Sequence, residues 1–288
     1  MLFGLIAAVL AALAYGSASV LQARGARSVE TADDGAQAGA PSLASTVTAV
    51  VTVPYLIGMA LDGVGFAANL VADRRLPLFL AQPVVSANLV VTAILAVLFL
   101  KARLSRRDVA GIAVVMLALV VLGFASGDEG HSDPRWLHAG VLIAGVIIVL
   151  GGGVLLPRLG KSVAVLSGLG AGALFGLMAV SVRIVDGLDP LNWPTLFTDP
   201  ALYAIVLCGV GGFYLFTVAL QTGSVSAASA ALVVGETVIP GALGMLLLED
   251  TTRHGWGLIA LVAFVAAVAG AVVVATSNAV EEIEAAAD

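Results

Sequence analysis

Two acidic residues lie inside long apolar runs of the sequence, where a charge is energetically costly. Glu236 is at the midpoint of the run Ser224–Leu248, and Asp62 is near the middle of the run Ala49–Ala72. Ionisable residues at membrane depth mark ion or substrate pathways by default. A desolvated carboxylate is stabilised by a proton or by a paired cation. We therefore expect Asp62 and Glu236 to bind protons, a cation or a cationic substrate.

Further polar residues accompany these carboxylates at helical spacing. Asn69 shares a helical face with Asp62, and Ser229 precedes Glu236 in its run. The run Leu76–Leu100 adds Gln82, Asn88 and Thr92. We expect these side chains to face the interior of the bundle, where they would line one polar cavity that binds a substrate or ion. For Asn69, Gln82, Asn88 and Thr92, the alternative is interhelical hydrogen bonding, worth about 0.6 kcal/mol each.

Pro240 follows Glu236 by four residues. A proline has no N–H to donate to the carbonyl four residues earlier, so we predict a helix break at Pro240 that frees the Glu236 carbonyl. Three structural alternatives stay open: Glu236 pairs with a residue such as Arg183, Glu236 stays protonated, or Asp62 lies at a solvated interface. Asp73, Arg74 and Arg75 are expected to form a solvated turn.

The composition indicates a membrane protein. Hydrophobic residues make up 60% and charged residues 11%, with a mean hydropathy of +1.08, whereas soluble domains carry roughly 25% charged residues. The 13 Lys and Arg residues are spread over 288 positions, so no nucleic-acid surface is expected. The single cysteine, Cys208, lies in an apolar span and is expected to be a packing residue.

The apolar runs predict an all-α, polytopic membrane bundle in one integral membrane domain, residues 1–288. We expect nine spans, since about 20 residues cross a bilayer, and loops at Arg24–Pro41, Lys101–Asp108 and Asp186–Asp199. Splitting Leu43–Ala72 into two short helices is the alternative and makes ten. The nine runs are Leu2–Leu21, Ala49–Ala72, Leu76–Leu100, Val109–Phe124, Leu137–Leu156, Val163–Val185, Pro200–Leu220, Ser224–Leu248 and Gly257–Thr276.

The distribution of basic residues predicts the orientation. With nine spans, one side carries 8 Lys and Arg residues (Arg24, Arg27, Lys101, Arg103, Arg106, Arg107, Arg158, Lys161) and the other 5 (Arg74, Arg75, Arg135, Arg183, Arg253). Cytoplasmic loops carry the excess of positive charge. The N-terminus is therefore expected outside and the C-terminus inside.

The chain contains an internal repeat. The segment Pro54–Gly65 matches Pro200–Gly211, and small residues recur every four positions in the first and sixth spans, where Tyr15-Gly16 aligns with Phe175-Gly176. Residues 1–125 and 162–277 are therefore predicted to be two repeats. A linking helix at 137–156 inverts the second repeat, and 278–288 form an acidic tail. Inverted repeats are typical of transporters, and we expect Gly168, Gly172 and Gly176 to serve helix packing.

Enzyme signatures do not appear in the sequence. Gly153–Ser162 ends like a phosphate-binding loop, but its required first glycine is Leu155. The three histidines lack metal-ligand spacing, and HExxH, GxSxG and CxxC motifs are missing. We expect neither an enzyme nor a cofactor.

A family resemblance rests on LPLFLAQPVVSANLVVTAILAVLFLKARLSRRDVAGIAVVMLALVVLG, residues 76–123, and on Leu248-Glu249-Asp250 after the eighth span. These segments resemble the EamA-like drug/metabolite transporter (DMT) superfamily, and the layout resembles its NIPA-type magnesium transporter branch. The resemblance implies a helical bundle of inverted repeats that carries out secondary transport. Where the family often has an acid after the third span, this chain has Lys101-Ala102-Arg103, and only Glu249 keeps the acid.

The expected function is secondary transport or export of small solutes by alternating access across the cell (plasma) membrane. The cavity is expected between spans two, three, seven and eight. Transport of Mg²⁺ or another divalent cation is the alternative, and a non-transporting subunit of an envelope complex is a second. Expected partners are the lipid bilayer and a small-molecule or cation substrate, with a homodimer left open.

Overall fold

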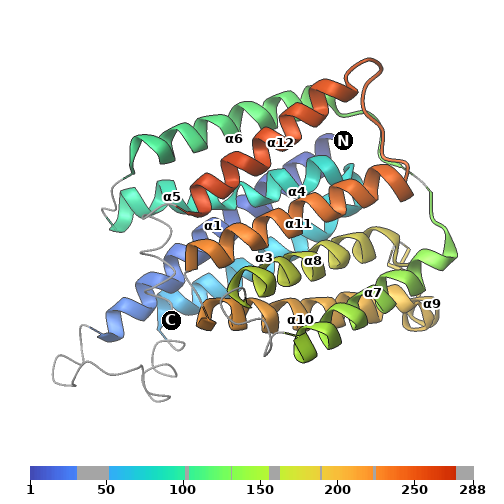
Figure 1. The fold of residues 1–288 in the computed structure, drawn as a ribbon, viewed down its shortest axis with the longest axis horizontal. Coiled ribbons are helices and arrows are strands. Elements are labelled where there is room, and N and C mark those ends of the chain that lie inside the picture. The colour runs from blue at the N-terminus through green and yellow to red at the C-terminus, as the bar shows by residue number, and fades with distance from the viewer. Residues whose placement is uncertain are drawn as a thin grey trace.

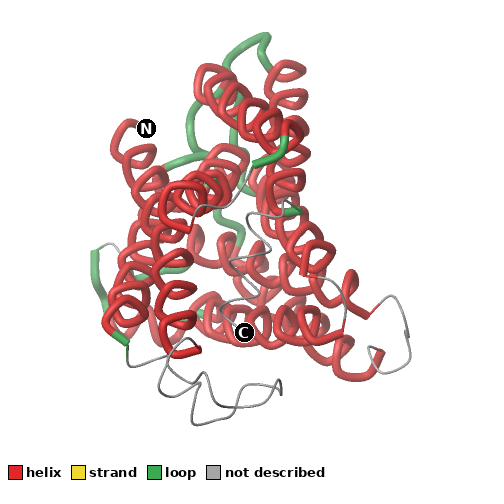
Figure 2. Tube along the Cα trace, turned by 90° about the vertical axis from the view of Figure 1, so that its left-hand side faces the viewer, coloured by secondary structure: helices red, strands yellow, loops and turns green. Residues whose placement is uncertain are grey.

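The fold is a bundle of membrane-length helices (Figure 1). The computed structural model describes residues 1–30, 52–100, 104–130, 132–155, 163–188, 190–222 and 225–276. Within these ranges, nine helices are long and apolar enough to cross a membrane, and the loops form two isolated β-bridges. Figure 2 shows the bundle nearly end-on, with the helices packed side by side. The predicted all-α, nine-span membrane architecture is confirmed.

The helices follow the predicted runs closely. The α6–α12 pair lies along the upper edge of Figure 1 and the α7–α10 pair along the lower edge, with the other spans between them. The elements are α1 (Leu2–Glu30), α3 (Val53–Arg75), α4 (Leu78–Ser86), α5 (Asn88–Leu95), the π-helix η1 (Ala96–Leu100), α6 (Arg106–Ala125), α7 (Arg135–Leu155), α8 (Val163–Ile184), α9 (Trp193–Thr198), α10 (Pro200–Thr222), α11 (Val225–Leu247) and α12 (Gly257–Ala275).

Some predicted boundaries differ from the structure. The loop expected from Arg24 begins later, because α1 continues to Glu30 through residues that mostly favour helix; residues 31–41 lie outside the described ranges. The loop Asp186–Asp199 contains α9, which Asn192 caps through its side-chain oxygen. The ten-helix alternative divided Leu43–Ala72 into two short helices. In the structure, α3 is one continuous helix from Val53, and residues 43–51 are outside the described ranges.

The start of α6 has a local explanation in the sequence. The hydroxyl of Ser105 accepts a hydrogen bond from the Asp108 backbone N–H at 3.2 Å, and the Asp108 carboxylate accepts one from the Ser105 N–H at 2.8 Å. This reciprocal capping box satisfies two N–H groups that a helix start leaves unpaired. Part of the LSRRD segment is therefore a helix N-terminus, and the loop expected to reach Asp108 ends at Ser105.

The third span is interrupted near its middle, where one helix was expected. Pro83 lies inside α4, which ends at Ser86, and α5 begins at Asn88. The Ala87 N–H between them is shared by the carbonyls of Pro83 and Val84, both at 3.2 Å. Such a tightened turn is common at helix ends. The interruption places the polar residues Ser86 and Asn88 next to each other in the middle of an apolar span.

Glycines bring α8 and α11 into backbone contact. A Cβ atom at Gly168 would lie 2.6 Å from the Ala228 carbonyl oxygen, and one at Gly176 would lie 2.7 Å from Cδ of Pro240. Between them, a Cβ at Gly172 would overlap the Leu232 carbonyl oxygen. Small residues permit this approach in membrane helices, so the predicted packing role of these glycines is confirmed.

The first half packs in a corresponding way. A Cβ at Gly4 would lie 2.8 Å from the Leu76 side chain, and one at Gly16 would lie 2.7 Å from the Asn88 carbonyl oxygen. The first span therefore packs on the third as the sixth packs on the eighth. The division into two inverted repeats remains a prediction, and this shared pattern supports it.

We predict that Gly172→Val destabilises the protein by about 1–3 kcal/mol or more, the usual cost of overpacking, because the α11 backbone cannot move as a side chain can. Thermal unfolding of the purified protein in detergent measures this. Gly123→Val is the matched control, since a Cβ placed there meets no other described part of the protein within 4 Å, apart from its own stretch of helix. Equal stability of the two variants would contradict the assigned contact.

Candidate functional site

A polar cavity lies between the two halves of the bundle; we call it the central cavity. Its volume is about 500 Å³. Helices α1, α3, α4, α5, α8, α10 and α11 contribute to its wall. The residues are Tyr15, Ser19, Asp62, Phe66, Asn69, Gln82, Val85, Ser86, Asn88, Phe175, Met178, Ala179, Gly209, Phe213 and Glu236.

Both intramembrane carboxylates line the central cavity. Asp62 of α3 accepts a hydrogen bond from Nε2 of Gln22 at 2.5 Å, and Glu236 of α11 accepts one from the Ser86 hydroxyl at 3.4 Å. The close approach of α8 fixes Glu236, since a Cβ at Gly172 would lie 2.9 Å from the Glu236 nitrogen. The structure thus brings together two residues that are 174 positions apart in the sequence.

Three of the predicted amide residues also line the cavity, namely Asn69, Gln82 and Asn88. Nε2 of Gln82 donates to the Asp73 carboxylate at 2.7 Å. Oδ1 of Asn69 is buried and has no hydrogen-bond partner among the residues that the structure describes. Buried polar atoms are nearly always paired, so an unpaired one calls for an explanation such as a bound ion or water.

Thr92 and Ser229 lie outside the wall of the central cavity. The Thr92 hydroxyl is buried and donates to the Gly16 carbonyl at 3.4 Å, which is the interhelical alternative considered for it. Ser229 is 3% exposed and lies next to Ala228, where α11 meets Gly168 of α8. The structure places both residues in helix packing.

Pro240 does not end its helix. Helix α11 continues through it to Leu247, so the predicted break is limited to the one hydrogen bond that a proline cannot donate. The pyrrolidine ring faces the gap left by Gly176. Neighbouring helices often accommodate a proline in this way within a membrane.

The cavity includes residues that the sequence analysis did not select. Helices α1 and α8 were not expected in its wall, yet they supply Tyr15, Ser19 and Phe175. The ring of Tyr15 lies over Gly65, where a Cβ would be 3.0 Å from it. Tyr15 and Phe175 align in the predicted repeats, so the match of Tyr15-Gly16 with Phe175-Gly176 is a sequence signal from which both could have been selected.

The charged side chains in the described part of the cavity wall are all acidic. Among the described residues that line the cavity, two are carboxylates and none is Lys, Arg or His. The polar atoms are mainly oxygens of carboxylate, amide and hydroxyl groups. Because a buried negative charge requires a nearby cation or a proton, this wall favours positively charged ligands.

A second polar cluster, the Arg183 cluster, is formed by Arg183, Asp250 and their partners, and Asp73 links it to Gln82 of the central cavity. Arg183 donates to the carbonyls of Asp73 at 2.8 Å and Leu76 at 2.7 Å, and it pairs with the Asp250 carboxylate at 3.3 Å. Asp250 also accepts from the backbone N–H groups of Leu78 at 2.7 Å and Gly130 at 2.9 Å. The cluster joins the ends of α3 and α8 to the loops after α6 and α11.

This arrangement overturns one expectation and one alternative. Asp73 is 1% exposed, and Arg74 donates to the carbonyls of Val182 in α8 and Val185 just after it, so no solvated turn forms at Asp73 and Arg74. The charged partners of Arg183 are Asp250 at 3.3 Å and Glu129 at 4.0 Å, and not Glu236. Glu249, the acid in the family position, is exposed with a φ of 63°, and the following residue, Asp250, makes the buried contacts. These partners are backbone groups distant in sequence, which no helical pattern identifies.

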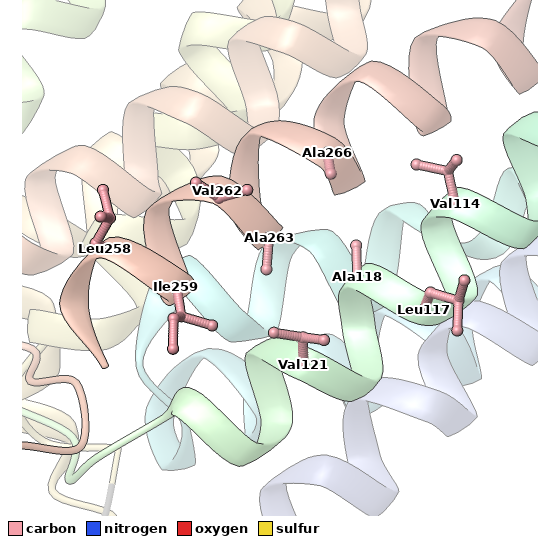
Figure 3. Close-up of a pocket in the computed structure, with 9 residues that line it drawn as sticks. All are labelled: Val114, Leu117, Ala118, Val121, Leu258, Ile259, Val262, Ala263 and Ala266. Atoms are coloured by element: carbon pink, nitrogen blue, oxygen red, sulfur yellow. The ribbon is translucent and has the colours of Figure 1, made fainter. Parts of the chain in front are cut away.

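Another cavity, of about 510 Å³, lies between α6 and α12 (Figure 3). Only apolar side chains line it, among them Leu117, Val121 and Val262. None of the predicted site residues lies there. Since a cavity without polar atoms offers no ligand for an ion, the central cavity remains the candidate site.

The family model described as magnesium transporter NIPA matches residues 1–152 of the chain. No curated protein matches the chain, and no solved structure does. The match covers Asp62, Asn69, Gln82 and Asn88 and ends before Glu236. It agrees with the resemblance drawn from residues 76–123 and favours a transporter over an enzyme. The chain therefore belongs to the magnesium transporter NIPA family, of the EamA-like drug/metabolite transporter type, and is a multi-pass membrane transporter.

Proposed function

We propose that the chain transports a divalent cation, Mg²⁺ in the first place, and binds it in the central cavity. The observation that carries this proposal is that Asp62 and Glu236 line the same cavity. The described residues of its wall include no basic side chain. Mg²⁺ prefers oxygen ligands and is usually held by one or two carboxylates. Asn69, Gln82 and Asn88 add amide oxygens, and Oδ1 of Asn69 has no partner in the described part of the chain.

The size of the cavity supports a partly hydrated ion. Mg²⁺ gives up its water reluctantly and has six ligands, and six waters at ~30 Å³ each occupy about 180 Å³. The cavity volume of about 500 Å³ holds such an ion with its water shell. Direct binding by both carboxylates is therefore not required.

We further infer that transport proceeds by alternating access across the plasma membrane. Next to the Arg183 cluster, Gln82 is 6% and Asp73 is 1% exposed, which supports a closed end of the cavity there. The positive-inside prediction places this end outside the cell. Opening it requires separation of the Arg183 cluster, which would expose the cavity to the other side of the membrane.

A small organic cation is the second candidate substrate, because the cavity wall is also aromatic. Tyr15, Phe66, Phe175 and Phe213 all line it. Aromatic faces attract organic cations, with about 2 kcal/mol or more gained when the cation is desolvated. A hydrated metal ion does not gain this contact.

We predict that Asp62→Asn and Glu236→Gln each lower Mg²⁺ flux into proteoliposomes at least about tenfold, because each removes a charge that offsets the ion's desolvation. The substitutions are isosteric, so the variants should fold normally. Asp128→Asn, which changes an exposed acid in the loop after α6, is the control. Wild-type flux in both cavity variants would overturn the proposed site.

We predict that Mg²⁺ raises the unfolding temperature of the purified protein and that Glu236→Gln abolishes this rise, since a ligand stabilises only the state that binds it. Tetramethylammonium, a quaternary organic cation, is the comparison probe. Stabilisation by tetramethylammonium and not by Mg²⁺, lost in Phe175→Leu, would instead favour the second candidate.

We predict that the double variant Arg183→Gln/Asp250→Asn opens the closed end. Both charges are removed together, because one buried charge left unpaired costs about 3–5 kcal/mol. In a Cys208→Ala background, Asn69→Cys should react with a membrane-impermeant thiol reagent several-fold faster when the Arg183 cluster is neutralised. Equal labelling rates with and without the double substitution would contradict the proposal that the Arg183 cluster closes this end of the cavity.

A further inference from the structure

A buried histidine lies between two carboxylates outside the central cavity, at the end of the bundle where α7 and α10 begin (Figure 1). His138 is 6% exposed. Its Nδ1 is 2.8 Å from Oδ1 of Asp199, and its Nε2 is 2.7 Å from Oδ1 of Asp133. Asp186 lies beside them, and we call these four residues the His138 cluster. None of them lines the central cavity.

Asp199 holds the imidazole in a fixed orientation. Its Oδ1 also accepts from the Ala201 N–H at 2.8 Å, and its Oδ2 accepts from the Asp186 N–H at 2.7 Å. With its own side chain 4% exposed, this carboxylate is anchored between α10 and the turn after α8. An Nδ1–H donated to Asp199 leaves the lone pair of Nε2 directed at Asp133, the orientation in which a carboxylate prepares a histidine to bind a metal.

The two contacts of His138 cannot both be made by a neutral ring. A neutral imidazole has one N–H and one lone pair, and here both nitrogens face carboxylate oxygens. A proton between Nε2 and Asp133 resolves the conflict, and so does a metal ion that both atoms bind after the Asp133 side chain turns. Asp186 supports the metal, because ligand atoms of Asp133, His138 and Asp186 lie within 4.8 Å of one another.

Space for an ion and its waters is present next to these three residues. A cavity of about 360 Å³ is lined by Asp133, His138, Asp186 and Asp199, together with Arg135, Thr195, Thr198 and Pro200. Asp133 is partly exposed and Asp186 is half-buried, so both side chains have room to turn toward a common point.

We propose that Asp133, Nε2 of His138 and Asp186 form a binding site for a transition-metal dication of the Zn²⁺ type, separate from the transported ion. One imidazole and two carboxylates suit Zn²⁺, whereas a Mg²⁺ site consists of oxygens alone. Three protein ligands leave the fourth tetrahedral position to water. The bound metal would join the start of α7 to the turn after α8, and thereby hold the linking helix against the second repeat.

The test uses the full-length chain, purified in detergent and stripped of metal with EDTA. Zn²⁺ binding is measured by competition with a chromophoric chelator, and Co²⁺ serves as a spectroscopic probe. We expect one Zn²⁺ per chain, a rise in unfolding temperature and Co²⁺ absorption bands of a site with nitrogen and oxygen ligands. Asp133→Asn and Asp186→Asn should each weaken Zn²⁺ binding by about tenfold or more without loss of the fold, because neither side chain is fully buried.

Two control variants separate this site from the central cavity. Asp128→Asn, in the same loop as Asp133, and Glu236→Gln should keep wild-type Zn²⁺ affinity. Mg²⁺ stabilisation should persist in Asp186→Asn. Absence of stoichiometric Zn²⁺, or equal affinity in Asp133→Asn, Asp186→Asn and the wild type, would overturn the proposal and assign the charge between His138 and Asp133 to a proton. Loss of Zn²⁺ binding in Glu236→Gln would overturn it as well, because the metal would then belong to the central cavity.

Discussion

Four of the carboxylates within or at the ends of the apolar helices each accept a hydrogen bond from a side chain of another helix. The donors are Gln22 to Asp62, Gln82 to Asp73, Ser86 to Glu236, and Arg183 to Asp250. A carboxylate without such a partner would be too costly in an apolar setting. The donors of these hydrogen bonds lie in α1, α4 and α8, and the acceptors lie in α3, α11 and the loop after α11. The bonds therefore hold these elements close to one another.

Helix α4 is the element that connects these contacts. The backbone N–H of Leu78 bonds to Asp250, the side chain of Gln82 to Asp73, and the hydroxyl of Ser86 to Glu236. These residues are spaced four apart, so they lie along one face of the helix. One face of α4 thus links the Arg183 cluster to the cavity carboxylate. A small shift of this helix changes both contacts, which is a direct route from ion binding to opening in the proposed cycle.

Much of this architecture was predictable from residue patterns. Nine spans follow from hydropathy, and the position of Asp62 and Glu236 in one cavity was expected from their depth and from the repeat. The Arg183 cluster could not be predicted. Arg183 bonds mainly to backbone carbonyl groups, which every residue has, so the sequence does not indicate its partners. Asp73 looked like a surface acid because Arg74 and Arg75 follow it. Thr92 and Ser229 have the spacing of cavity residues, yet the turn at Ala87 and the contact of α8 with α11 place them in packing.

The polar contacts of the Arg183 cluster, at one end of the bundle, have a consequence for the direction of transport. If the unloaded carrier keeps that end shut, only a small fraction of molecules is competent to bind an ion arriving from there. Apparent affinity falls in proportion to the competent fraction, although the binding residues are the same for both sides. Transport of ions that arrive from the opposite side would therefore saturate at a lower ion concentration than transport from the side of the Arg183 cluster. The strength of the Arg183–Asp250 pair, rather than any ligand of the ion, would set the ratio between the two.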